Sequence, residues 1–385
     1  MKKKWEYIAL SSVCKVQNGF AFNSKLFNES NNGLPLIRIR DIKRGYSLTY
    51  TDETCSDDFF VEDGDMLIGM DGDFNIGEWK GGHALLNQRV CKLIPSEKIL
   101  AKFIFYFIPE ALQRINDKTA FSTVKHLSSR QVNAILLPNL PLSEQQSIVE
   151  YLDSSFAKID KLKENAAKNL EEAKALFQSA LKNALEPKEG WEEKTLKEVS
   201  LSITDGDHMP PPKANEGIPF VTISNIDKDS NTLSMKNTFY VPEDYYNNLK
   251  EERKPRKGDL LYTVTGSFGI PVVVDSNDRF CFQRHIAMIR PDNNKITSEF
   301  LYYWCLSPNA KMIADQVATG TAQRTVSLTS LRKFIIPIPS IKEQELLVST
   351  LTTIEEKLNT LQQNYSRICD ECDALKQAIL RQVFE

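Results

Sequence analysis

An internal repeat constrains the fold of this chain more than any other feature, because the motifs of the first half return in the second half in the same order. The longest match aligns Gly33–Ile42 (GLPLIRIRDI) with Gly217–Ile226 (GIPFVTISNI). The shorter matches are Trp5-Glu6 with Trp191-Glu192, Gly64–Ile68 with Gly258–Tyr262, Gln88-Arg89 with Gln283-Arg284, Leu137-Pro138 with Ile336-Pro337, and Glu144–Gln146 with Glu343–Glu345. A shared order over this length indicates a tandem duplication, which predicts two copies of one plan.

Each half has the same internal organisation, a mixed region followed by a long helix. The first ~140 residues of each half alternate short β-branched and aromatic runs with Gly, Asn and Asp turns, which predicts strands with some helix. A proline-containing exit follows, and Glu144 or Glu343 then falls in the first turn of a helix, where negative charge interacts favourably with the helix dipole. We therefore expect a first domain at 1–142, a long helix at 143–187, a second domain at 188–341 and a second long helix at 342–385.

A seven-residue hydrophobic periodicity marks both long helices. In the second helix, apolar residues alternate steps of four and three: Leu347, Leu351, Ile354, Leu358, Leu361, Tyr365, Ile368, Cys372, Leu375 and Ile379. In the first helix, with Lys163 as the exception, the repeat comprises Leu152, Phe156, Ile159, Ala166, Leu170, Ala173, Phe177, Ala180 and Ala184. Such seams predict a coiled coil, and at ~1.5 Å per residue each helix would be about 60 Å long.

Two such helices in equivalent places of one chain most simply pair with each other. The expected fold class is therefore α+β, with two tandem-repeated α/β domains separated by two long antiparallel helices that form an intramolecular coiled coil of pseudo-two-fold symmetry. Two alternatives stay open at this point: that each helix packs on its own domain, and that the seam joins two copies of the chain.

The two halves differ in polar residues while they retain the apolar scaffold. Ile37–Arg40 aligns with Val221–Ser224, and the arginines at the second and fourth positions become Thr222 and Ser224. Because strand residues alternate faces, these polar residues are expected opposite the buried face. An enzyme formed by duplication would retain a reactive constellation, whereas a reader of two different messages would keep its fold and change its reading face. The sequence favours the second.

The candidate contact residues are those whose side chains bond base edges and phosphates, together with nearby aromatic residues. In the first half they are Arg38, Arg40, Lys43, Arg44, Tyr46, Asn75, Trp79, Lys80, Gln88, Arg89 and Lys125. In the second half they are His208, Lys213, Thr222, Ser224, Thr265, Ser267, Gln283, Arg284, Gln323 and Arg324. The two Gln-Arg pairs are the strongest candidates, because they recur at equivalent places in otherwise variable regions.

Catalytic and metal-binding patterns are missing from the sequence. It has neither a GxxxxGK[ST] phosphate loop nor a strand–GxGxxG–helix fingerprint, and its four histidines show no ligand spacing. The pair Cys369 and Cys372 has no second CxxC to complete a zinc site. Asp244 with Glu252 and Lys254 fits the D…ExK pattern of metal-dependent nucleases only loosely and has no counterpart in the first half. We expect no catalytic residue and no metal site in this chain.

Charge and hydropathy narrow the class of protein further. The formal net charge of −3 excludes a strongly basic chromatin-type protein but not nucleic-acid binding, which depends on where charge is placed. The N-terminal lysines are not followed by the apolar stretch of a signal peptide, and no run approaches the ~20 apolar residues of a membrane span. A cytoplasmic protein without a membrane partner is expected.

The combination of these motifs resembles the specificity subunit of type I restriction–modification systems. The resemblance covers essentially the whole chain and is carried by GLPLIRIRDI and GIPFVTISNI, by the exits LLPNLPLSEQQ (136–146) and IIPIPSIKEQE (335–345), and by GDLLYTVTGSFG (258–269), FQRHIAMIRP (282–291) and GTAQRTVSLTSLRKF (320–334). The first half departs from the pattern at Gly69–Asp73, where Thr263–Ser267 stands in the second half. Different contacts are therefore expected from the two halves at this position.

The resemblance implies a function and a set of partners. Each domain would be a target-recognition domain that reads one half of a bipartite target in double-stranded DNA, and the helices would set the spacer and dock two methyltransferase subunits. Restriction (translocase) subunits would join the complex. S-adenosylmethionine, ATP and Mg²⁺ would be bound by these partners, with no cofactor on this chain. Two rival classes remain: a coiled-coil scaffold or adaptor protein without a DNA role, and a nuclease or methyltransferase in its own right.

Overall fold

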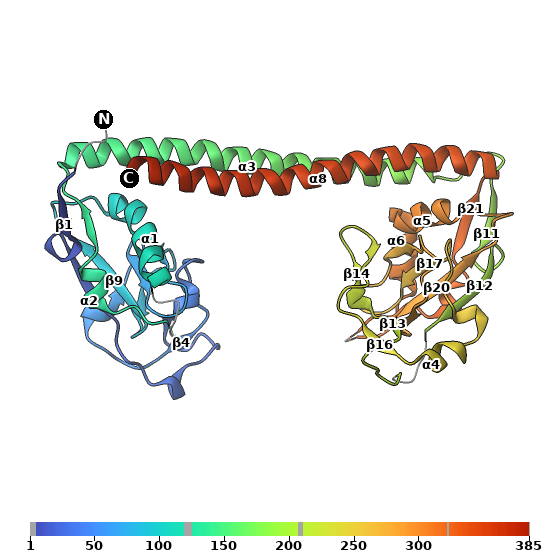
Figure 1. Ribbon diagram of the computed structural model, residues 1–385, viewed down its shortest axis with the longest axis horizontal. Coiled ribbons are helices and arrows are strands. Elements are labelled where there is room, and N and C mark those ends of the chain that lie inside the picture. The colour runs from blue at the N-terminus through green and yellow to red at the C-terminus, as the bar shows by residue number, and fades with distance from the viewer. Residues whose placement is uncertain (1–4, 119–124, 207–210, 322, 385) are drawn as a thin grey trace. The chain divides into compact units, whose positions relative to one another are not determined.

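The computed structural model describes residues 5–118, 125–206, 211–321 and 323–384, which divide into two compact units. The first unit comprises residues 1–163 and 369–385, and the second comprises residues 164–368. Each unit therefore combines one half of the repeat with parts of both long helices (Figure 1). Both units mix helices and strands, as the α+β class predicts.

Within the described residues, the first unit contains two four-stranded sheets and one two-stranded sheet. The first sheet is antiparallel and runs in the order β2 (Cys14–Asn18), β9 (Val90–Pro95), β6 (Met66–Gly69) and β7 (Ile76–Glu78). The second runs in the order β4 (Tyr50–Thr51), β3 (Leu34–Ile37), β8 (Ala84–Leu86) and β5 (Phe60–Val61). The remaining elements are β1 (Tyr7–Ala9) paired with β10 (Leu136–Pro138), α1 (Ala101–Lys118), α2 (Ser129–Asn133), and 3-10 helices at Leu10–Ser12, Ser24–Leu26, Ile39–Asp41 and Asp57–Phe59.

The second unit repeats this plan. Its antiparallel sheet runs in the order β12 (Ser200–Asp205), β20 (Ile286–Pro291), β17 (Leu260–Thr263) and β18 (Pro271–Val273). Its second sheet runs in the order β16 (Phe239–Val241), β13 (Ile218–Val221) and β19 (Cys281–Phe282). The remaining elements are β11 (Glu192–Thr195) paired with β21 (Ile335–Ile338), β14 (Ile226–Asp227) paired with β15 (Thr232–Leu233), α4 (Glu243–Asn247), α5 (Ser298–Leu306), α6 (Pro308–Val317), α7 (Leu328–Leu331), and 3-10 helices at Ile223–Asn225 and Glu251–Arg253.

Strand register shows that the two halves share one fold. The parallel pairing of Ile37 with Leu86 in the first unit corresponds to that of Val221 with Phe282 in the second. In the antiparallel sheets, Met66 pairs with Leu93, and Leu260 pairs with Ile289. The tandem duplication expected from the sequence is confirmed at the level of individual residue pairs.

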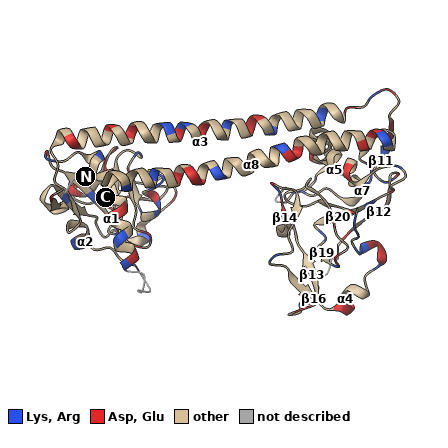
Figure 2. Cartoon of the chain, turned by 45° about the horizontal axis from the view of Figure 1, so that its top comes forward, with Lys and Arg blue, Asp and Glu red and all other residues tan. Residues whose placement is uncertain are grey.

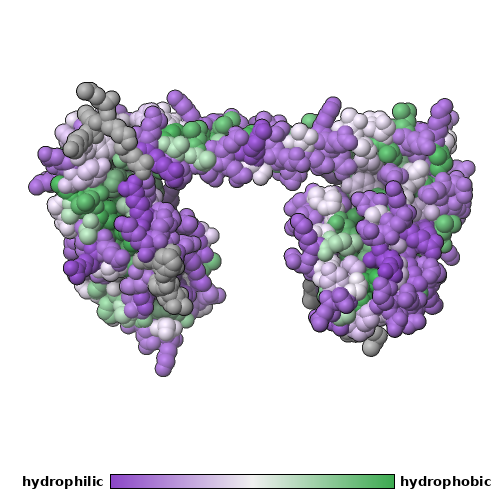
Figure 3. Space-filling view, viewed as in Figure 1, coloured by the Kyte–Doolittle hydropathy of each residue, from purple (hydrophilic) through white to green (hydrophobic). Residues whose placement is uncertain are grey.

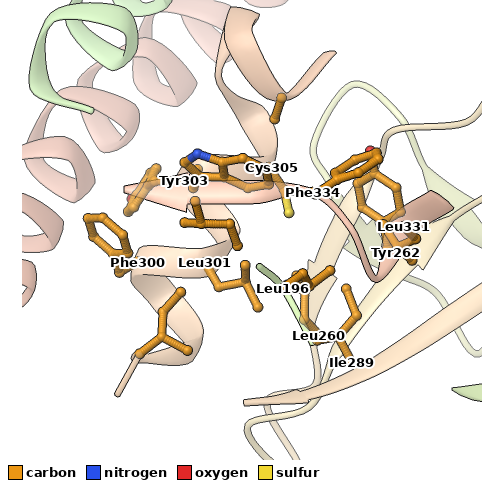
Figure 4. Packing of buried hydrophobic residues seen from close by; sticks show 14 of the residues in the cluster. Leu196, Leu260, Tyr262, Ile289, Phe300, Leu301, Tyr303, Cys305, Leu331 and Phe334 are labelled. Atoms are coloured by element: carbon orange, nitrogen blue, oxygen red, sulfur yellow. The ribbon is translucent and has the colours of Figure 1, made fainter. Parts of the chain in front are cut away.

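A hydrophobic core between α5 and the antiparallel sheet holds the second unit together. In Figure 4, Leu196 lies between Leu301 of α5 and the sheet residues Leu260 and Ile289, and all four belong to one cluster of buried residues. The cluster continues into the long helices, since it also contains Leu181 and other residues of both. Because the core joins the sheet to the helices, the polar loops of this unit are held on a rigid support.

The long helices are α3 (Leu142–Ala184) and α8 (Ile341–Phe384), and both are continuous (Figure 1). Within the first unit, Lys163 Nζ lies 2.9 Å from Asp373 Oδ1, and Lys376 Nζ lies 2.5 Å from Asp160 Oδ1. Residue numbers rise along α3 as they fall along α8, so the two helices pair in antiparallel orientation, as the seam pattern predicts.

The seam itself follows the predicted heptads with one correction. Several of its predicted members lie in or against one core cluster of the second unit, among them Phe177, Leu347, Leu351, Ile354 and Leu358. Leu152, Ile159 and Leu170 are also buried, and Leu361 and Ile368 are half-buried. Leu375 was expected in the seam but is 49% exposed. At this point the adjacent Lys376 lies over the Phe156 ring, 5.3 Å from its centroid, so the lysine covers the seam instead.

The start of each long helix is fixed by a buried glutamine that recurs in both halves. Gln145 accepts a hydrogen bond from the Leu100 amide at 2.9 Å and donates to the Leu140 carbonyl at 2.8 Å. Gln344 likewise accepts from the Thr297 amide at 2.9 Å and donates to the Pro339 carbonyl at 3.0 Å. The repeated Glu-Gln signature therefore has a structural role, which is to tie the helix to the preceding domain.

Among the described residues, no helix combines the length with the apolar character that crossing a bilayer requires.

Candidate nucleic-acid interface

A polar cluster gathers at one end of the antiparallel sheet of the first unit. Gln88 and Arg89 are the central residues of the turn between β8 and β9, which is closed by the Val90 amide donating to the Asn87 carbonyl at 2.9 Å. Both side chains are exposed. Arg89 Nε lies 3.3 Å from Asp71 Oδ2, and His126 Nδ1 lies 2.6 Å from Asp71 Oδ1.

Lys125 joins the same cluster through the backbone, because its carbonyl accepts a hydrogen bond from the Gly72 amide at 3.0 Å. The structure thus brings together Gln88, Arg89 and Lys125 from separate segments of the sequence. His126, which stands out in the sequence together with Lys125, and Asp71, which was missed as a site candidate, complete the cluster. The cluster presents cationic and amide side chains of the kind that bond base edges and phosphates.

The second unit forms the corresponding cluster from different side chains. Its turn between β19 and β20 is closed by the Ile286 amide donating to the Gln283 carbonyl at 3.1 Å, so Arg284 and His285 are central. Thr325 Oγ1 lies 3.3 Å from Thr265 Oγ1. Two hollows of about 300 and 320 Å³ share Thr265, His285 and Gln323 as lining residues, and Ser267 lines one of them while Arg284 lines the other.

The expected equivalence of the two Gln-Arg pairs is wrong by one residue. Leu86 is equivalent to Phe282 and Val90 to Ile286, since they occupy the same strand positions. Arg89 is therefore equivalent to His285 and not to Arg284. The sequence itself contains a signal for this offset. When the two halves are aligned without gaps on Pro95 and Pro291, which end equivalent strands, Arg89 falls opposite His285.

A second polar group lies where β3 ends, and here the expected strand alternation is wrong. The strand stops at Ile37 and a 3-10 helix covers Ile39–Asp41, so Arg38 and Arg40 do not alternate with buried strand residues. The buried Asp41 Oδ2 accepts a hydrogen bond from the Arg38 amide at 2.9 Å, and its carboxylate is also contacted by Arg44. Asp41 thus turns the chain and leaves the Arg38 and Arg40 side chains exposed.

Neighbouring candidates separate into exposed and buried residues. Lys43, Tyr46 and Lys80 are exposed, and the Lys80 amide donates to the Gly45 carbonyl at 3.1 Å, which places these residues side by side. Asn75 is half-buried. Trp79 was expected at the surface, but it is 1% exposed and donates its indole N–H to the Gly82 carbonyl at 2.6 Å. It is a core residue, so its assignment as a contact residue is corrected.

The remaining candidates of the second half are dispersed. Thr222 and Ser224 lie at the equivalent 3-10 turn, with their hydroxyl oxygens 2.7 Å apart, whereas Lys213 lies over the Phe239 ring at 5.2 Å. Arg324 forms an ion pair with Asp315 at 3.2 Å. Gln283 is half-buried, and Thr265 is buried apart from the hollow that it lines. His208 lies outside the described residues.

A metal site in the described part of the chain would require a group of suitable ligands, and a reactive thiol would require a lowered pKa. No group of three or more His, Cys, Asp or Glu residues there is arranged to hold a metal ion. Burial raises the pKa of the Cys14 thiol to about 11 and that of Cys91 to about 12, so both stay protonated at neutral pH.

Charged residues of both signs are interspersed along α3 and α8 (Figure 2), and the face of the molecule shown in Figure 3 is mostly hydrophilic.

Two glycines control the position of the turns that carry these clusters. A Cβ atom at Gly19 would lie 2.1 Å from the Asn87 carbonyl oxygen, and one at Gly206 would lie 1.9 Å from the Phe282 carbonyl oxygen. The approach is against backbone, which no side-chain rotation relieves. The turns therefore depend on glycine at both equivalent positions.

We expect Gly19→Ala to displace the 87–90 turn and to destabilise the first unit by about 1–3 kcal/mol, because the methyl group overlaps the backbone. The midpoint temperature of thermal unfolding should fall, and hydrogen exchange should become faster at the amides of this turn. Gly206→Ala serves as the mirror control and should affect the turn of the second unit only. Unchanged exchange in Gly19→Ala would contradict the steric argument.

Comparison with known proteins identifies the family. Residues 2–172 and 188–368 each match the type I restriction modification DNA specificity domain. The chain is 30% identical over 408 residues to the specificity subunit of the type I restriction enzyme EcoBI from Escherichia coli, with 99% of this chain and 85% of that relative covered. It is 22% identical to the MjaVIII specificity subunit from Methanocaldococcus jannaschii, with 91% and 86% covered.

Solved structures share the fold. One, described as the structural basis of complex assembly and conformational transition of the type I R-M system, contains a chain with a TM-score of 0.72 at 20% identity, covering 99% of this chain and 97% of that one. The HsdS subunit from Thermoanaerobacter tengcongensis gives a TM-score of 0.54 at 18% identity, covering 99% and 96%. With a family match in each half of the repeat and this fold along its length, the chain belongs to the family of type I restriction modification DNA specificity domains.

Proposed function

We propose that each half of this chain reads one half of a bipartite target in double-stranded DNA. The observation that carries the proposal is the pair of equivalent clusters, which share one backbone frame but differ in side chains. Arg89 stands where His285 stands in the second half, and Asp71 stands where Thr265 stands. One frame with two polar sets is suited to reading two different sequences.

The two long helices set the spacing between the half-sites and dock two methyltransferase subunits, one for each half of the repeat. Support comes from the continuity of α3 over 43 residues and of α8 over 44 residues. Their antiparallel seam gives two equivalent helical surfaces on one chain. Equivalent surfaces favour two copies of the same partner.

The chemistry of the complex belongs to the partners under this proposal. The methyltransferase subunits bind S-adenosylmethionine and methylate DNA, and the restriction (translocase) subunits use ATP and Mg²⁺. This chain binds none of these cofactors and contributes sequence choice and assembly. The match of both halves to the specificity domain and the 30% identity to the EcoBI specificity subunit support this division of roles.

A native pull-down of the tagged chain from its own host tests the assembly, with stoichiometric partners identified by mass. A co-purifying DNA methyltransferase at two copies per chain is expected. Selection of duplexes from a randomised pool by that complex should then yield two defined half-sites. A complex that selects no sequence would overturn the proposed function, and a single methyltransferase copy would overturn the stoichiometry.

Replacing the exposed pair at the first turn, Gln88→Ala with Arg89→Ala, should relax recognition in one half-site only. Loss of a base contact costs about 1–3 kcal/mol at the affected position, because the base edge is left without its hydrogen-bond partner. Duplex selection by the assembled complex measures this. Lys80→Ala serves as a comparison, since loss of a phosphate contact would weaken all sequences alike and lower the salt slope by about 0.9. Equal relaxation of both half-sites by the double variant would be incompatible with two separate readers.

A further inference from the structure

The position of Asp71 raises the question of what its carboxylate does. We call Asp71, Arg89 and His126 the Asp71 triad, and we call the equivalent Thr265, His285 and Thr325 the Thr265 triad. The equivalence follows from hydrogen bonds that recur in both units. The Met70 amide donates to the Arg89 carbonyl at 3.0 Å, as Val264 does to His285 at 2.9 Å, and residue 71 bridges to 126 as 265 bridges to 325.

The carboxylate is not needed to hold the loops together. In the first unit, backbone hydrogen bonds from Gly72 to Lys125 at 3.0 Å and from Leu127 to Met70 at 2.7 Å already join the two loops. In the second unit, Gly266 bonds to Arg324 at 3.0 Å and Val326 to Val264 at 2.8 Å, and the same loops meet around a threonine. The frame therefore forms without a charge at this position.

The side chains of the Asp71 triad are arranged with the carboxylate inside and its two nitrogen partners outside. The Asp71 side chain is 25% exposed, whereas Arg89 is 53% and His126 is 49% exposed. One carboxylate oxygen faces Arg89 Nε and the other faces His126 Nδ1. A carboxylate would be repelled by DNA phosphates if it faced them itself, so its place behind Arg89 and His126 favours an orienting role.

This arrangement leaves nitrogen atoms of Arg89 and His126 available for hydrogen bonds to a ligand. An arginine held at Nε keeps both Nη nitrogens for the bidentate pattern that matches the O6 and N7 atoms of guanine. A histidine whose Nδ1–H donates to a carboxylate presents Nε2 on its other side. The Thr265 triad offers hydroxyls and an imidazole at the edge of a hollow instead. The two triads thus present different hydrogen-bonding patterns on one frame.

We propose that Asp71 is a positioning residue for the first half-site, which orients Arg89 and His126 toward base edges, and that the Thr265 triad determines the base read at the equivalent place of the second half-site. This inference rests on the proposed function and adds to it the residues that set specificity. Under this inference, Arg89 contacts a guanine in the major groove.

The test uses the full chain assembled with its methyltransferase subunits, and it measures base preference at every position of both half-sites by duplex selection. Asp71→Ala should lower the preference for guanine at one position of the first half-site about tenfold or more, and leave the second half-site unchanged. Asp71→Asn should restore part of that preference, because its amide oxygen still accepts a hydrogen bond. Thr265→Ala should change the second half-site only.

Asp73→Ala is the matched control, because it removes the same charge from an exposed residue of the same loop and should leave both half-sites unchanged. Thermal unfolding of each variant separates loss of fold from loss of reading, and Arg89→Ala and His126→Ala probe the same position if Asp71→Ala does not fold. Unchanged preferences in folded Asp71→Ala, or an equal change in both half-sites, would overturn the inference. If the wild-type complex selects no sequence, the proposed function itself fails, which is a distinct result.

Discussion

A seven-residue insertion in both long helices is expected to lengthen the spacer that the complex accepts while both half-site sequences stay the same. The insertions belong between Glu164 and Asn165 in α3 and between Glu371 and Cys372 in α8, just beyond the ion pair of Lys163 with Asp373. One heptad keeps the seam in phase. It adds about 10 Å to each helix, at about 1.5 Å per residue, which corresponds to about three base pairs at about 3.4 Å each.

Duplex selection with spacers of every length measures this shift. An insertion in α3 alone is the control, because it breaks the match between the two helices and should give no new defined spacer. A folded double-insertion variant that retains the original spacer would show that the helices do not set the distance between the half-sites.

A large loss of stability from a single substitution is expected for Gln344→Leu. The leucine has similar size, but it leaves the Thr297 amide and the carbonyls of Lys295 and Pro339 without their partner in the protein interior. Each unpaired buried group costs about 1–3 kcal/mol, so a loss of about 3 kcal/mol or more in the free energy of unfolding is expected. Denaturant unfolding of the isolated chain measures it.

Two matched variants sharpen this experiment. Gln363→Leu lies in the same helix at an exposed position and should change the stability little. Gln145→Leu removes the equivalent hydrogen bonds in the first unit and should destabilise that unit by a similar amount. An unchanged midpoint in Gln344→Leu would show that the glutamine is not what fixes the start of the helix.

Long-range patterns in the sequence predicted the architecture well. The repeat and the heptads are set by burial over many residues, so one aberrant position such as Leu375 does not disturb them. The antiparallel pairing also followed, because two equivalent seams in one chain can cover each other. The prediction of these features tolerates an exceptional residue, because each feature depends on many residues that act together.

Local features of the site were less predictable, for physical reasons that differ between residues. Arg38 was placed on a strand because the apolar alternation continues through Ile39, but the buried Asp41 caps a 3-10 turn there. Trp79 stands among polar and glycine residues, yet it fills the core beneath them. Asp71 was passed over because its role depends on Arg89 and His126, which are distant in sequence.

The core of the first unit combines two segments that are far apart in the sequence, and this affects the order in which the units can fold during translation. Phe384 packs its ring against Phe103 and Phe107, with ring centroids 5.6 and 5.3 Å away, and Leu380 is buried in the same core. About 200 residues, which form the second unit, separate this segment from the rest of that core. At about 5–20 residues per second, the ribosome needs roughly 10–40 s to produce them. The half that is synthesised first therefore completes its core last, after the second unit has emerged.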